Sequence, residues 1–470
     1  MSAVVTVNPA TGEPLAEYAA FTDADVDAAL ERAAGAQQEW AARPIDERAV
    51  VLRRVAGLLR EEIDDLALLV TREMGKPLVE ARAEVEKCAT TCDFYADNTA
   101  AFLADEPVET SADRSWISYD PVGVVLAVMP WNFPLWQVLR FAAPALMAGN
   151  GALLKHSPNT TGCALAVERL LAAAGAPAGL FAALVVAEPD VPAVTARLIA
   201  DPRIGAVTIT GSERAGRAVG AAAGGAVKKS VLELGGSDPF VVLADADLPR
   251  VAALAARGRL MNAGQSCISP KRLIVEASVA EEFTRLLVAE VDGLVVGDPE
   301  ASGTHVGPMA RADLRDGVHQ QVEASVAAGA RLLAGGHPLP GPGCFYAPTV
   351  LADVVPGVPA YEEEVFGPVA VVIVARDEDD AVRIADDTRF GLGASVWTGD
   401  PARGIAVARR IRSGAAFVNA LVASDPRMPF GGTRASGYGR ELAAAGIREF
   451  VNVRTWWVLD EPGGAAPVSE

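Results

Sequence analysis

The chain has 470 residues, of which 51% are apolar, and at roughly 150 residues per domain this length favours about three structural units. Lys and Arg total 41 against 60 Asp and Glu, so the formal net charge is −19. This balance argues against a partner that is a nucleic acid, although a local basic pocket for a small anion remains compatible with it.

The beginning of the chain has neither the basic segment nor the long apolar core of a signal peptide. No later apolar run approaches the roughly 18 residues of a membrane-spanning helix. We therefore expect a cytoplasmic protein that has no membrane partner. Because the five cysteines are scattered, odd in number and free of any Cys-x-x-Cys pair, we expect reduced thiols and neither disulfides nor a metal site. They are Cys88, Cys92, Cys163, Cys267 and Cys344.

The first hundred residues have a helical pattern. Residues 22–104 are rich in Ala, Leu, Glu and Arg with helical periodicity, which predicts a helical beginning. Within residues 46–71, one helix face is expected to carry the apolar positions Val50, Leu52, Val55, Leu58, Leu59 and Ile63.

From Gly123 onward, short apolar strands alternate with helices, which predicts a parallel sheet whose ligands bind at the carboxyl ends of the strands. A second alternating region, from Phe240 to about Phe417, predicts a second α/β unit. The strands expected first are 124–129, 151–155, 184–186 and 204–209, with helices at 135–147 and 163–174. The strands expected later are 240–242, 272–276, 369–374 and 393–397.

Two stretches, 115–120 and 450–459, have strand character but fit neither α/β unit. An apolar terminal strand that has no partner in its own domain suggests pairing with another subunit.

A cysteine, Cys267, directly follows a polar turn that contains glycine, Asn-Ala-Gly-Gln-Ser. A thiol of pKa ~8.5 is only a few per cent ionised at neutral pH, so a nucleophile needs an electropositive or helix N-terminal setting. A buried free cysteine is the common alternative for any one thiol. Sequence position alone favours Cys267 only slightly.

One carboxylate, Glu233, lies in the apolar run Val-Leu-Glu-Leu that ends in two glycines. Desolvation raises the pKa of such a group, which suits a general base. A Glu paired with a lysine or capping a helix is the alternative.

Asn132 follows the expected strand 124–129, in Pro-Trp-Asn-Phe-Pro, and precedes a helix. Its amide N–H could stabilise an oxyanion, and losing one such donor costs on the order of 10²–10³ in rate. An Asn that only stabilises a turn is the alternative. Similarly, the strand 204–209 runs into Thr-Gly-Ser-Glu, which indicates a helix starting at Ser212 whose N–H groups could hold a pyrophosphate.

Together and in this order, these segments resemble the aldehyde dehydrogenase family over essentially the whole chain. The resemblance implies that Cys267 is the nucleophile and that Glu233 activates the water that cleaves a thioester. It also implies that Asn132 and the backbone N–H of Cys267 form the oxyanion hole. The Glu at position 233 favours hydrolysis to a free acid over transfer of the acyl group to coenzyme A. The implied cofactor-binding residues are Trp131, Lys155, His156, Ser157, Gly211, Ser212, Leu234, Glu364 and Phe366.

The resemblance also implies an α/β fold of the aldehyde dehydrogenase type and an assembly into a homo-dimer or homo-tetramer. The expected fold comprises a Rossmann-type NAD(P)-binding domain, a second α/β catalytic domain and an oligomerisation arm made of β-strands. The expected limits are 1–104 and 122–235 for the first, 236–430 for the second, and 105–121 and 445–470 for the arm.

More narrowly, the motifs around Asn132, Lys155 and Glu233 resemble bacterial succinate-semialdehyde dehydrogenases. Arg140 matches an arginine that binds the distal carboxylate in that subgroup, and a guanidinium can bind a carboxylate through two hydrogen bonds. An arginine in a routine surface ion pair is the alternative. Met261 replaces a second substrate arginine that is often found six residues before the nucleophile. Help is therefore expected from Ser424 or Arg427.

Cofactor choice depends on the residues after Lys155. Strict NAD users of the family typically have a Glu three residues on, whose charge repels a 2′-phosphate, but this chain has Pro158 there. His156 and Ser157 add neutral or weakly basic donors. We therefore expect NADP to be accepted, with preference, and NAD to be used more weakly.

Other functions have less support. A catalytically inactive protein of the same fold conflicts with the joint presence of the expected catalytic residues. A cysteine hydrolase or acyltransferase needs a His beside the Cys, and the four histidines form no recognisable arrangement of that kind. A dehydrogenase for glutarate semialdehyde or for plain aliphatic aldehydes is the main alternative within the family. The histidines are His156, His305, His319 and His337.

Overall fold

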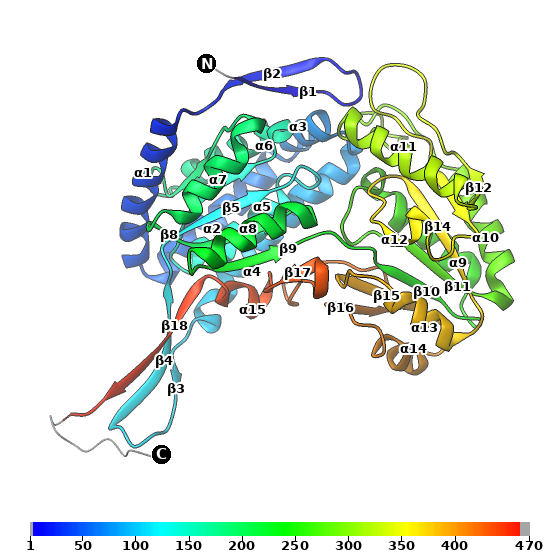
Figure 1. Ribbon diagram of the computed structural model, residues 1–470. Helices are drawn as coiled ribbons and strands as arrows, with labels where there is room; N and C mark the ends of the chain where they lie inside the picture. Colours follow the sequence, from blue (N-terminus) through cyan, green and yellow to red (C-terminus); the bar gives the residue numbers. More distant parts are fainter. Residues whose placement is uncertain (1–2, 461–470) are drawn as a thin grey trace.

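The structure is a computed structural model that describes residues 3–460, and two twisted sheets carry most of this part of the chain (Figure 1). The first sheet has six strands, five of them parallel, as the alternation of strands and helices predicts. In spatial order they are β17 (Gly437–Tyr438), β9 (Lys229–Glu233), β8 (Ile204–Thr210), β5 (Val124–Met129), β6 (Gly151–His156) and β7 (Phe181–Ala183).

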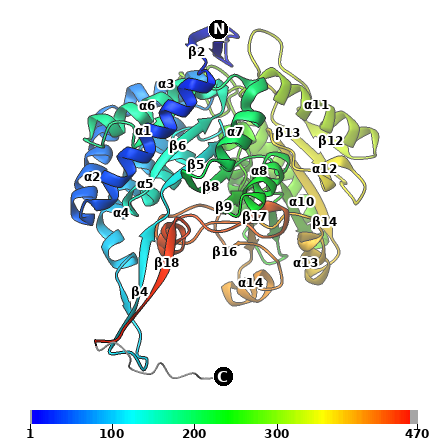
Figure 2. The same cartoon turned by 60° about the vertical axis from the view of Figure 1, so that its left-hand side comes forward.

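Helices cover both faces of this sheet (Figures 1 and 2). Along β5, Val125 and Ala127 face one core cluster whereas Val124 and Leu126 face another, so every position of the strand is apolar. One face packs on α2 (Ile45–Glu61), α3 (Ile63–Met74), α4 (Leu78–Phe102), α5 (Trp136–Met147) and α6 (Thr161–Ala173). The other packs on α1 (Asp23–Ala42), α7 (Val191–Ala200) and α8 (Glu213–Gly225).

The expected strands 124–129, 151–155 and 204–209 are confirmed as β5, β6 and β8, but the strand expected at 184–186 is wrong. The strand β7 ends at Ala183, one residue before that segment. Leu184 still donates a backbone hydrogen bond to Leu154, whereas the carbonyl of Val185 accepts one from Phe21. The apolar run at 184–186 is therefore buried without continuing the strand.

The helical pattern of residues 22–104 is confirmed, but one expected core position is wrong. Val50 is 63% exposed, whereas Leu52 and Val55 are buried. Val50 precedes Leu52 by two residues, so the helix turns it away from the buried face. The N-terminal hairpin, which the sequence did not predict, pairs β1 (Ala3–Val7) with β2 (Pro14–Ala19).

The second sheet has seven strands and is parallel except for its edge strand β12. The four strands expected here are confirmed as β10, β11, β14 and β15. In spatial order the strands are β12 (Arg331–Ala334), β13 (Thr349–Ala352), β14 (Val369–Ala375), β11 (Arg272–Glu276), β10 (Pro239–Val242), β15 (Gly393–Trp397) and β16 (Ala415–Val418).

This second sheet is also covered on both faces. One core cluster includes α9 (Leu248–Leu260) and α10 (Ala277–Asp292). The other includes α11 (Ala312–Ala327), α12 (Pro359–Glu362), α13 (Glu378–Asp386) and α14 (Pro401–Ala408). Short helices lie in the connections: η1 (Pro158–Thr160), η2 (Glu188–Asp190), η3 (Met261–Gly264), η4 (Arg434–Ser436) and α15 (Ala443–Arg448).

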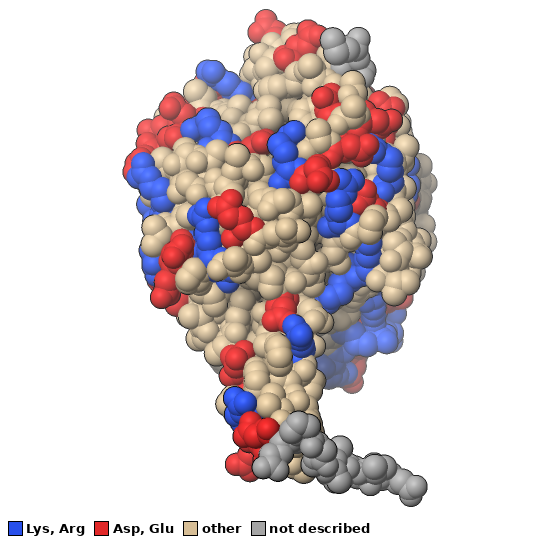
Figure 3. All heavy atoms as spheres, turned by 90° about the vertical axis from the view of Figure 1, so that its left-hand side faces the viewer, with Lys and Arg blue, Asp and Glu red and all other residues tan. Residues whose placement is uncertain are grey.

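A three-stranded arm extends from the body beside the six-stranded sheet (Figures 1 and 3). It consists of β18 (Val451–Val458), β4 (Arg114–Pro121) and β3 (Glu106–Pro107), and Trp116 stacks on Trp456 with ring centroids 5.3 Å apart. Both expected strands exist, and the terminal one, β18, finds its partner within this arm and outside the two α/β sheets. It pairs antiparallel with β4 over eight residue pairs. The last part of the expected arm, 461–470, lies outside the described residues.

Within residues 3–460, no helix combines the length and apolar composition that crossing a membrane requires.

Candidate active site

A cavity of about 770 Å³ lies between the two sheets and receives the side chain of Cys267. Its walls come from α4, α5, α9, the turn before Cys267 and the loop 422–430. The residues that line this cavity include Glu84, Lys87, Trp136, Arg140, Arg257, Cys267, Ser424 and Phe430.

The turn before Cys267 has an unusual backbone. Asn262 and Ala263 have φ values of 54° and 51°, and Gly264 has 72°. A non-glycine residue in this region is sterically strained, so surrounding contacts must hold the turn. A Cβ atom on Gly264 would lie 2.1 Å from the carbonyl oxygen of Gly367. The turn therefore packs directly against the loop 363–368, which carries Glu364 and Phe366.

Arg259 holds this turn, and the sequence did not point to it. Its guanidinium is fully buried and donates to the carbonyl of Gly264 at 3.1 Å and to the hydroxyl of Ser269 at 2.9 Å. It also donates to the carbonyls of Val365 and Val369 at 2.7 Å each. Because one side chain bonds both segments, it fixes the Cys267 turn relative to the loop 363–368.

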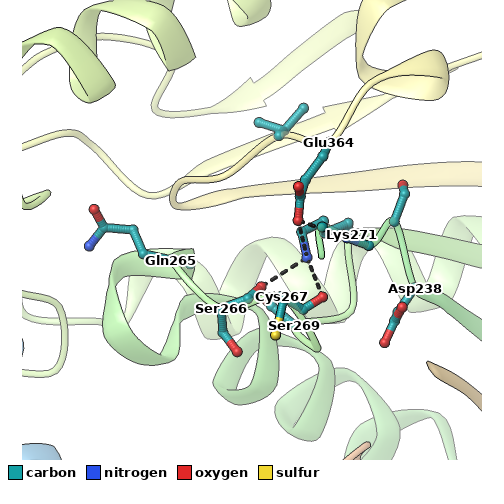
Figure 4. A network of polar contacts seen from close by, with 12 residues as sticks. Asp238, Gln265, Ser266, Cys267, Ser269, Lys271 and Glu364 are labelled. Atoms are coloured by element: carbon teal, nitrogen blue, oxygen red, sulfur yellow. Dashed lines mark hydrogen bonds and ion pairs between the residues drawn. The ribbon is translucent and has the colours of Figure 1, made fainter. Parts of the chain in front are cut away.

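The Lys271 ammonium lies beside the backbone of Ser266 and Cys267, and the Cys267 sulfur points away from it (Figure 4). The ammonium donates to the carbonyls of Ser266 at 2.8 Å and Cys267 at 2.7 Å, and it lies 3.2 Å from the Glu364 carboxylate. This network links the backbone of the nucleophile to a residue expected to bind the cofactor.

Cys267 differs from the other four cysteines, which are buried, because it alone of them is partly exposed. Burial raises the pKa of its thiol to about 11, and the nearby charges of Lys271 and Arg140 oppose this shift without cancelling it. The electropositive setting expected for the nucleophile is thus present but weaker than the effect of burial. The resting group is a protonated thiol that must lose its proton before it attacks.

Asn132 lies beside the nucleophile turn and is 5% exposed. Its side-chain amide nitrogen donates to the backbone carbonyl of Gln265 at 3.1 Å, and its backbone carbonyl accepts from the side-chain amide of Asn262 at 2.8 Å. Since an amide nitrogen has two hydrogens, one remains for an oxyanion. The strained turn and Asn132 therefore hold each other in place.

Glu233, at the end of β9, is 2% exposed. Burial raises the pKa of its carboxyl group well above the usual value, and the neighbouring carboxylate of Glu441 raises it further. Arg140 partly opposes both effects. The buried carboxyl with a raised pKa that the apolar sequence predicts is therefore present, and its neighbour Glu441 could not be predicted from that sequence.

Glu441 forms a buried ion pair with Arg140, which lines the cavity, and their side chains have exposures of 1% and 2%. Arg140 also donates to the hydroxyl of Thr210 at 3.2 Å. Its guanidinium carbon lies 5.0 Å from the ring centroid of Phe430. Arg140 thus lines the cavity as expected, but its charge is already neutralised by a carboxylate. The alternative of a surface ion pair does not hold, because both partners are buried.

Several residues expected to bind a cofactor lie along the carboxyl edge of the six-stranded sheet. Lys155 is 7% exposed, burial lowers its pKa to about 8, and it has no ion-pair partner among residues 3–460. A buried ammonium without a carboxylate is costly, so this position fits an anionic ligand. Ser212 caps α8 by accepting from the N–H of Ala215, which places that helix start at the same edge.

Other residues expected to bind the cofactor, among them Leu234, Glu364 and Phe366, pack closely against their neighbours. A Cβ atom on Gly216 would lie 2.3 Å from the Leu234 side chain. Glu364 accepts a hydrogen bond from the N–H of Gly236 at 3.1 Å, and Phe366 meets Trp131 edge to face at 5.9 Å between centroids. Of these residues, Glu364 is linked to the backbone of Cys267 through Lys271.

His156 and Ser157 are held more firmly than expected. The ring of His156 bonds the carbonyl of Pro134 and the hydroxyl of Thr160, each at 2.9 Å, and burial lowers its pKa to about 4. The side chain is therefore neutral and already bonded at both nitrogens. The Ser157 hydroxyl donates to the side-chain oxygen of Asn159 at 2.6 Å. Its oxygen can still accept a hydrogen bond, and the hydroxyl can turn to donate to another acceptor.

The family model described as "Aldehyde dehydrogenase family" matches residues 2–456. The chain belongs to this family. It is 49% identical over 456 residues to a protein of Synechocystis named a probable succinate-semialdehyde dehydrogenase [NADP(+)], covering 97% of this chain and 100% of that one. It is 47% identical over 453 residues to a succinate semialdehyde dehydrogenase [NAD(P)+] of Escherichia coli, covering 96% and 97%.

Solved structures agree with this assignment of the aldehyde dehydrogenase fold. A structure described as succinic semialdehyde dehydrogenase from Streptococcus pyogenes in complex with NADP+ superposes with a TM-score of 0.94 at 36% identity, covering 97% of this chain and all of that one. The predicted α/β fold of the aldehyde dehydrogenase type is therefore confirmed.

The three residues expected to bind the substrate of this aldehyde dehydrogenase differ in position. Arg140 and Ser424 line the cavity that contains Cys267. Arg427 does not, and this expectation is wrong, because its side chain is 75% exposed and bonds Asp425 through two nitrogens. The sequence missed Lys87, which reaches the cavity from α4 and donates to the Ser424 hydroxyl at 2.7 Å.

Proposed function

We propose that this aldehyde dehydrogenase oxidises succinate semialdehyde to succinate with NADP, and more weakly with NAD. The observation that carries the proposal is one cavity that holds a thiol, Cys267, together with cationic side chains that include Arg140. A four-carbon aldehyde whose far end is a carboxylate matches both features. The names of the relatives at 47% and 49% identity support the same substrate.

The proposed reaction starts with loss of the Cys267 proton and attack of the sulfur on the aldehyde carbon. The Asn132 amide and the Cys267 backbone N–H donate to the oxygen that becomes negative, which lowers the barrier. A nicotinamide cofactor bound beside Cys267 would supply the acceptor for the hydride that leaves the tetrahedral carbon. The product of this first half is a thioester on Cys267.

Glu233 serves the second half of the reaction. Its carboxylate takes a proton from a water molecule, and the hydroxide oxygen attacks the thioester carbon. The carbon–sulfur bond breaks, succinate is released, and the proton returns to the Cys267 sulfur. A raised pKa makes this carboxyl group a suitable base at neutral pH.

We also propose a separate role for each part of the chain. Residues 1–104 and 122–235 bind NAD(P), with Lys155, Ser157, Gly211 and Ser212 toward the phosphates and Trp131, Leu234, Glu364 and Phe366 toward the nicotinamide end. Residues 236–430 supply the nucleophile. The strands within 105–121 and 445–470 pair with another copy of the chain in a homo-dimer or homo-tetramer, since β18 leaves one edge unpaired within the described chain. Free thiols throughout support a cytoplasmic location.

The substrate proposal is tested by comparing succinate semialdehyde with butanal, an uncharged aldehyde of equal length. We expect kcat/KM to be at least about 10-fold higher for the charged aldehyde, since a hydrogen bond to a charged group contributes about 1.5–3 kcal/mol. Cofactor absorbance measures both rates. Equal values, or a preference for butanal, would contradict the proposal.

The cofactor proposal is tested by the substitution Pro158→Glu. The wild type should use NADP with the higher kcat/KM, and the new carboxylate should lower that value by about 10- to 100-fold through repulsion of the 2′-phosphate. The value for NAD should change much less. The neutral substitution Pro158→Gln is the matched control. A wild type that strongly prefers NAD would refute the proposed preference.

A further inference from the structure

Lys87 is a cation inside the cavity that has no carboxylate partner. It extends from α4, where its ammonium donates to the Ser424 hydroxyl at 2.7 Å and lies 4.3 Å from the ring centroid of Trp136. No acidic side chain among residues 3–460 forms an ion pair with it. An ammonium has three donors, so at least one is left unused by these two contacts and is available to a ligand in the cavity.

The other charged residues of the cavity wall are already bonded within the protein or exposed. Glu80 accepts a hydrogen bond from the N–H of Asn262 at 2.9 Å, and burial raises the pKa of its carboxyl group to about 7. Glu290 is exposed. Arg140 is paired with Glu441, and Glu84 is paired with Lys76 and accepts from the N–H groups of Leu135 and Trp136. Each pair has no net charge. Arg257, on α9, lies at the surface, where solvent screens its charge.

We propose that Lys87, together with Ser424, binds the distal carboxylate of the substrate and is the main determinant of preference for a carboxylated aldehyde. This inference rests on the proposed function. Arg140 can add hydrogen bonds to the same carboxylate, but Lys87 supplies the net positive charge that the pair of Arg140 and Glu441 lacks.

Trp136 gives this subsite its shape. Its ring lies next to both cations, with the Lys87 ammonium 4.3 Å and the Arg140 guanidinium carbon 6.0 Å from its centroid. The apolar ring can cover the methylene carbons of the substrate while the ammonium binds the carboxylate at its end. An aldehyde without a carboxylate would leave the half-buried ammonium without an ion-pair partner.

The titration of Lys87 supports this role. Burial and the nearby charge of Arg140 lower its pKa to about 8, while Glu84, Asp425 and Cys88 act in the opposite direction. Asp425 is bonded to Arg427, Glu84 to Lys76, and burial holds the Cys88 thiol protonated. Lys87 is therefore charged below a pH of about 8 and becomes neutral above it, whereas the substrate carboxylate stays charged.

The substitution Lys87→Met, which keeps the length and removes the charge, tests the proposal. We expect kcat/KM for succinate semialdehyde to fall by about 10- to 100-fold, mainly through KM, with a much smaller change for butanal. Lys87→Arg should retain most of the preference. Arg257→Met, which removes a cation from the rim of the same cavity, is the matched control and should change the ratio of the two kcat/KM values by less than about 3-fold.

A pH profile of the intact wild type gives a second test that needs no variant. Between about pH 7 and pH 9.5, at saturating cofactor, the ratio of kcat/KM for succinate semialdehyde to that for butanal should fall as Lys87 loses its proton. Taking the ratio removes the ionisation of Cys267 and Lys155, which act on both aldehydes alike. A ratio that does not change with pH overturns the role of Lys87.

The outcomes separate the two proposals. If the wild type shows no preference for the carboxylated aldehyde, the proposed function fails. If the wild type has the preference and Lys87→Met keeps it, the function stands and the role of Lys87 is refuted. A preference that is lost in Arg257→Met instead would also refute it.

Discussion

Replacing Cys267 by Ser is expected to lower the oxidation of every aldehyde by at least about 10³-fold, since removing a nucleophile from a group of residues that act together abolishes most of the rate enhancement. A serine hydroxyl ionises far less readily than a thiol. The site favours ionisation at position 267 only in part. Burial raises the pKa of the thiol to about 11, although the charges of Lys271 and Arg140 oppose this shift. Cofactor absorbance at saturating aldehyde measures the loss.

Cys344→Ser is the matched control for this substitution. Cys344 is a buried thiol in a loop that does not line the cavity, so the same exchange of sulfur for oxygen should leave kcat within about 3-fold. Binding of NADP, followed by protein fluorescence, should be retained in Cys267→Ser and would show that the variant is folded. If Cys267→Ser kept most of its turnover, the thioester mechanism would be wrong.

The strands that the sequence located best are those that are covered on both faces. The strands β5 and β14 are apolar throughout because helices pack on either side of them. The missed strands β12 and β16 lie at the two edges of their sheet and contain no fully buried residue, so their patterns lack that signal. The strand β13 was missed although it is buried, because its four residues give only a short pattern. Apolar content predicts burial, and it predicts a strand only where a neighbour on the sheet is also present.

The candidate site shows the same limit at the level of single residues. Cys267, Glu233 and Asn132 could be found because each sits in a local pattern and because the patterns resemble one family. Glu441 and Arg259 could not, since their partners are distant in the sequence and only the fold brings them together. Arg427 failed for a local reason, because Asp425, two residues earlier, binds its guanidinium at the surface.

Lys87 shows why a resemblance alone is an incomplete guide to specificity. Arg140 was the residue that matched the subgroup, and it does line the cavity. The sequence could not show that Glu441 neutralises it, nor that α4 brings a lysine to the same space. The net charge of a binding site depends on which ion pairs the fold has already formed.

Replacing Glu233 by Gln is expected to separate the two halves of the reaction. The amide keeps the size of the side chain but cannot take a proton from water, so steady-state turnover should fall by about 10²–10⁴-fold. Attack by Cys267 does not use this group, so one equivalent of cofactor should still be reduced quickly. Stopped-flow absorbance would record this burst, and intact-protein mass spectrometry would detect an acyl group on Cys267.

Glu168→Gln provides the control. Glu168 is a part-buried carboxylate that does not line the cavity, and it accepts one hydrogen bond from the N–H of Ala183. The side-chain carbonyl of a Gln can accept the same hydrogen bond. This variant should show normal turnover and no accumulated acyl group. A Glu233→Gln protein that lost the burst as well would place this carboxyl in the first half of the reaction, where it would deprotonate the Cys267 thiol. That result would fit the raised pKa of the thiol, because a thiol that is protonated at rest needs a base, and burial raises the pKa of the Glu233 carboxyl in the direction that strengthens it as a base. The burst therefore decides whether Glu233 acts on water alone or on the sulfur too.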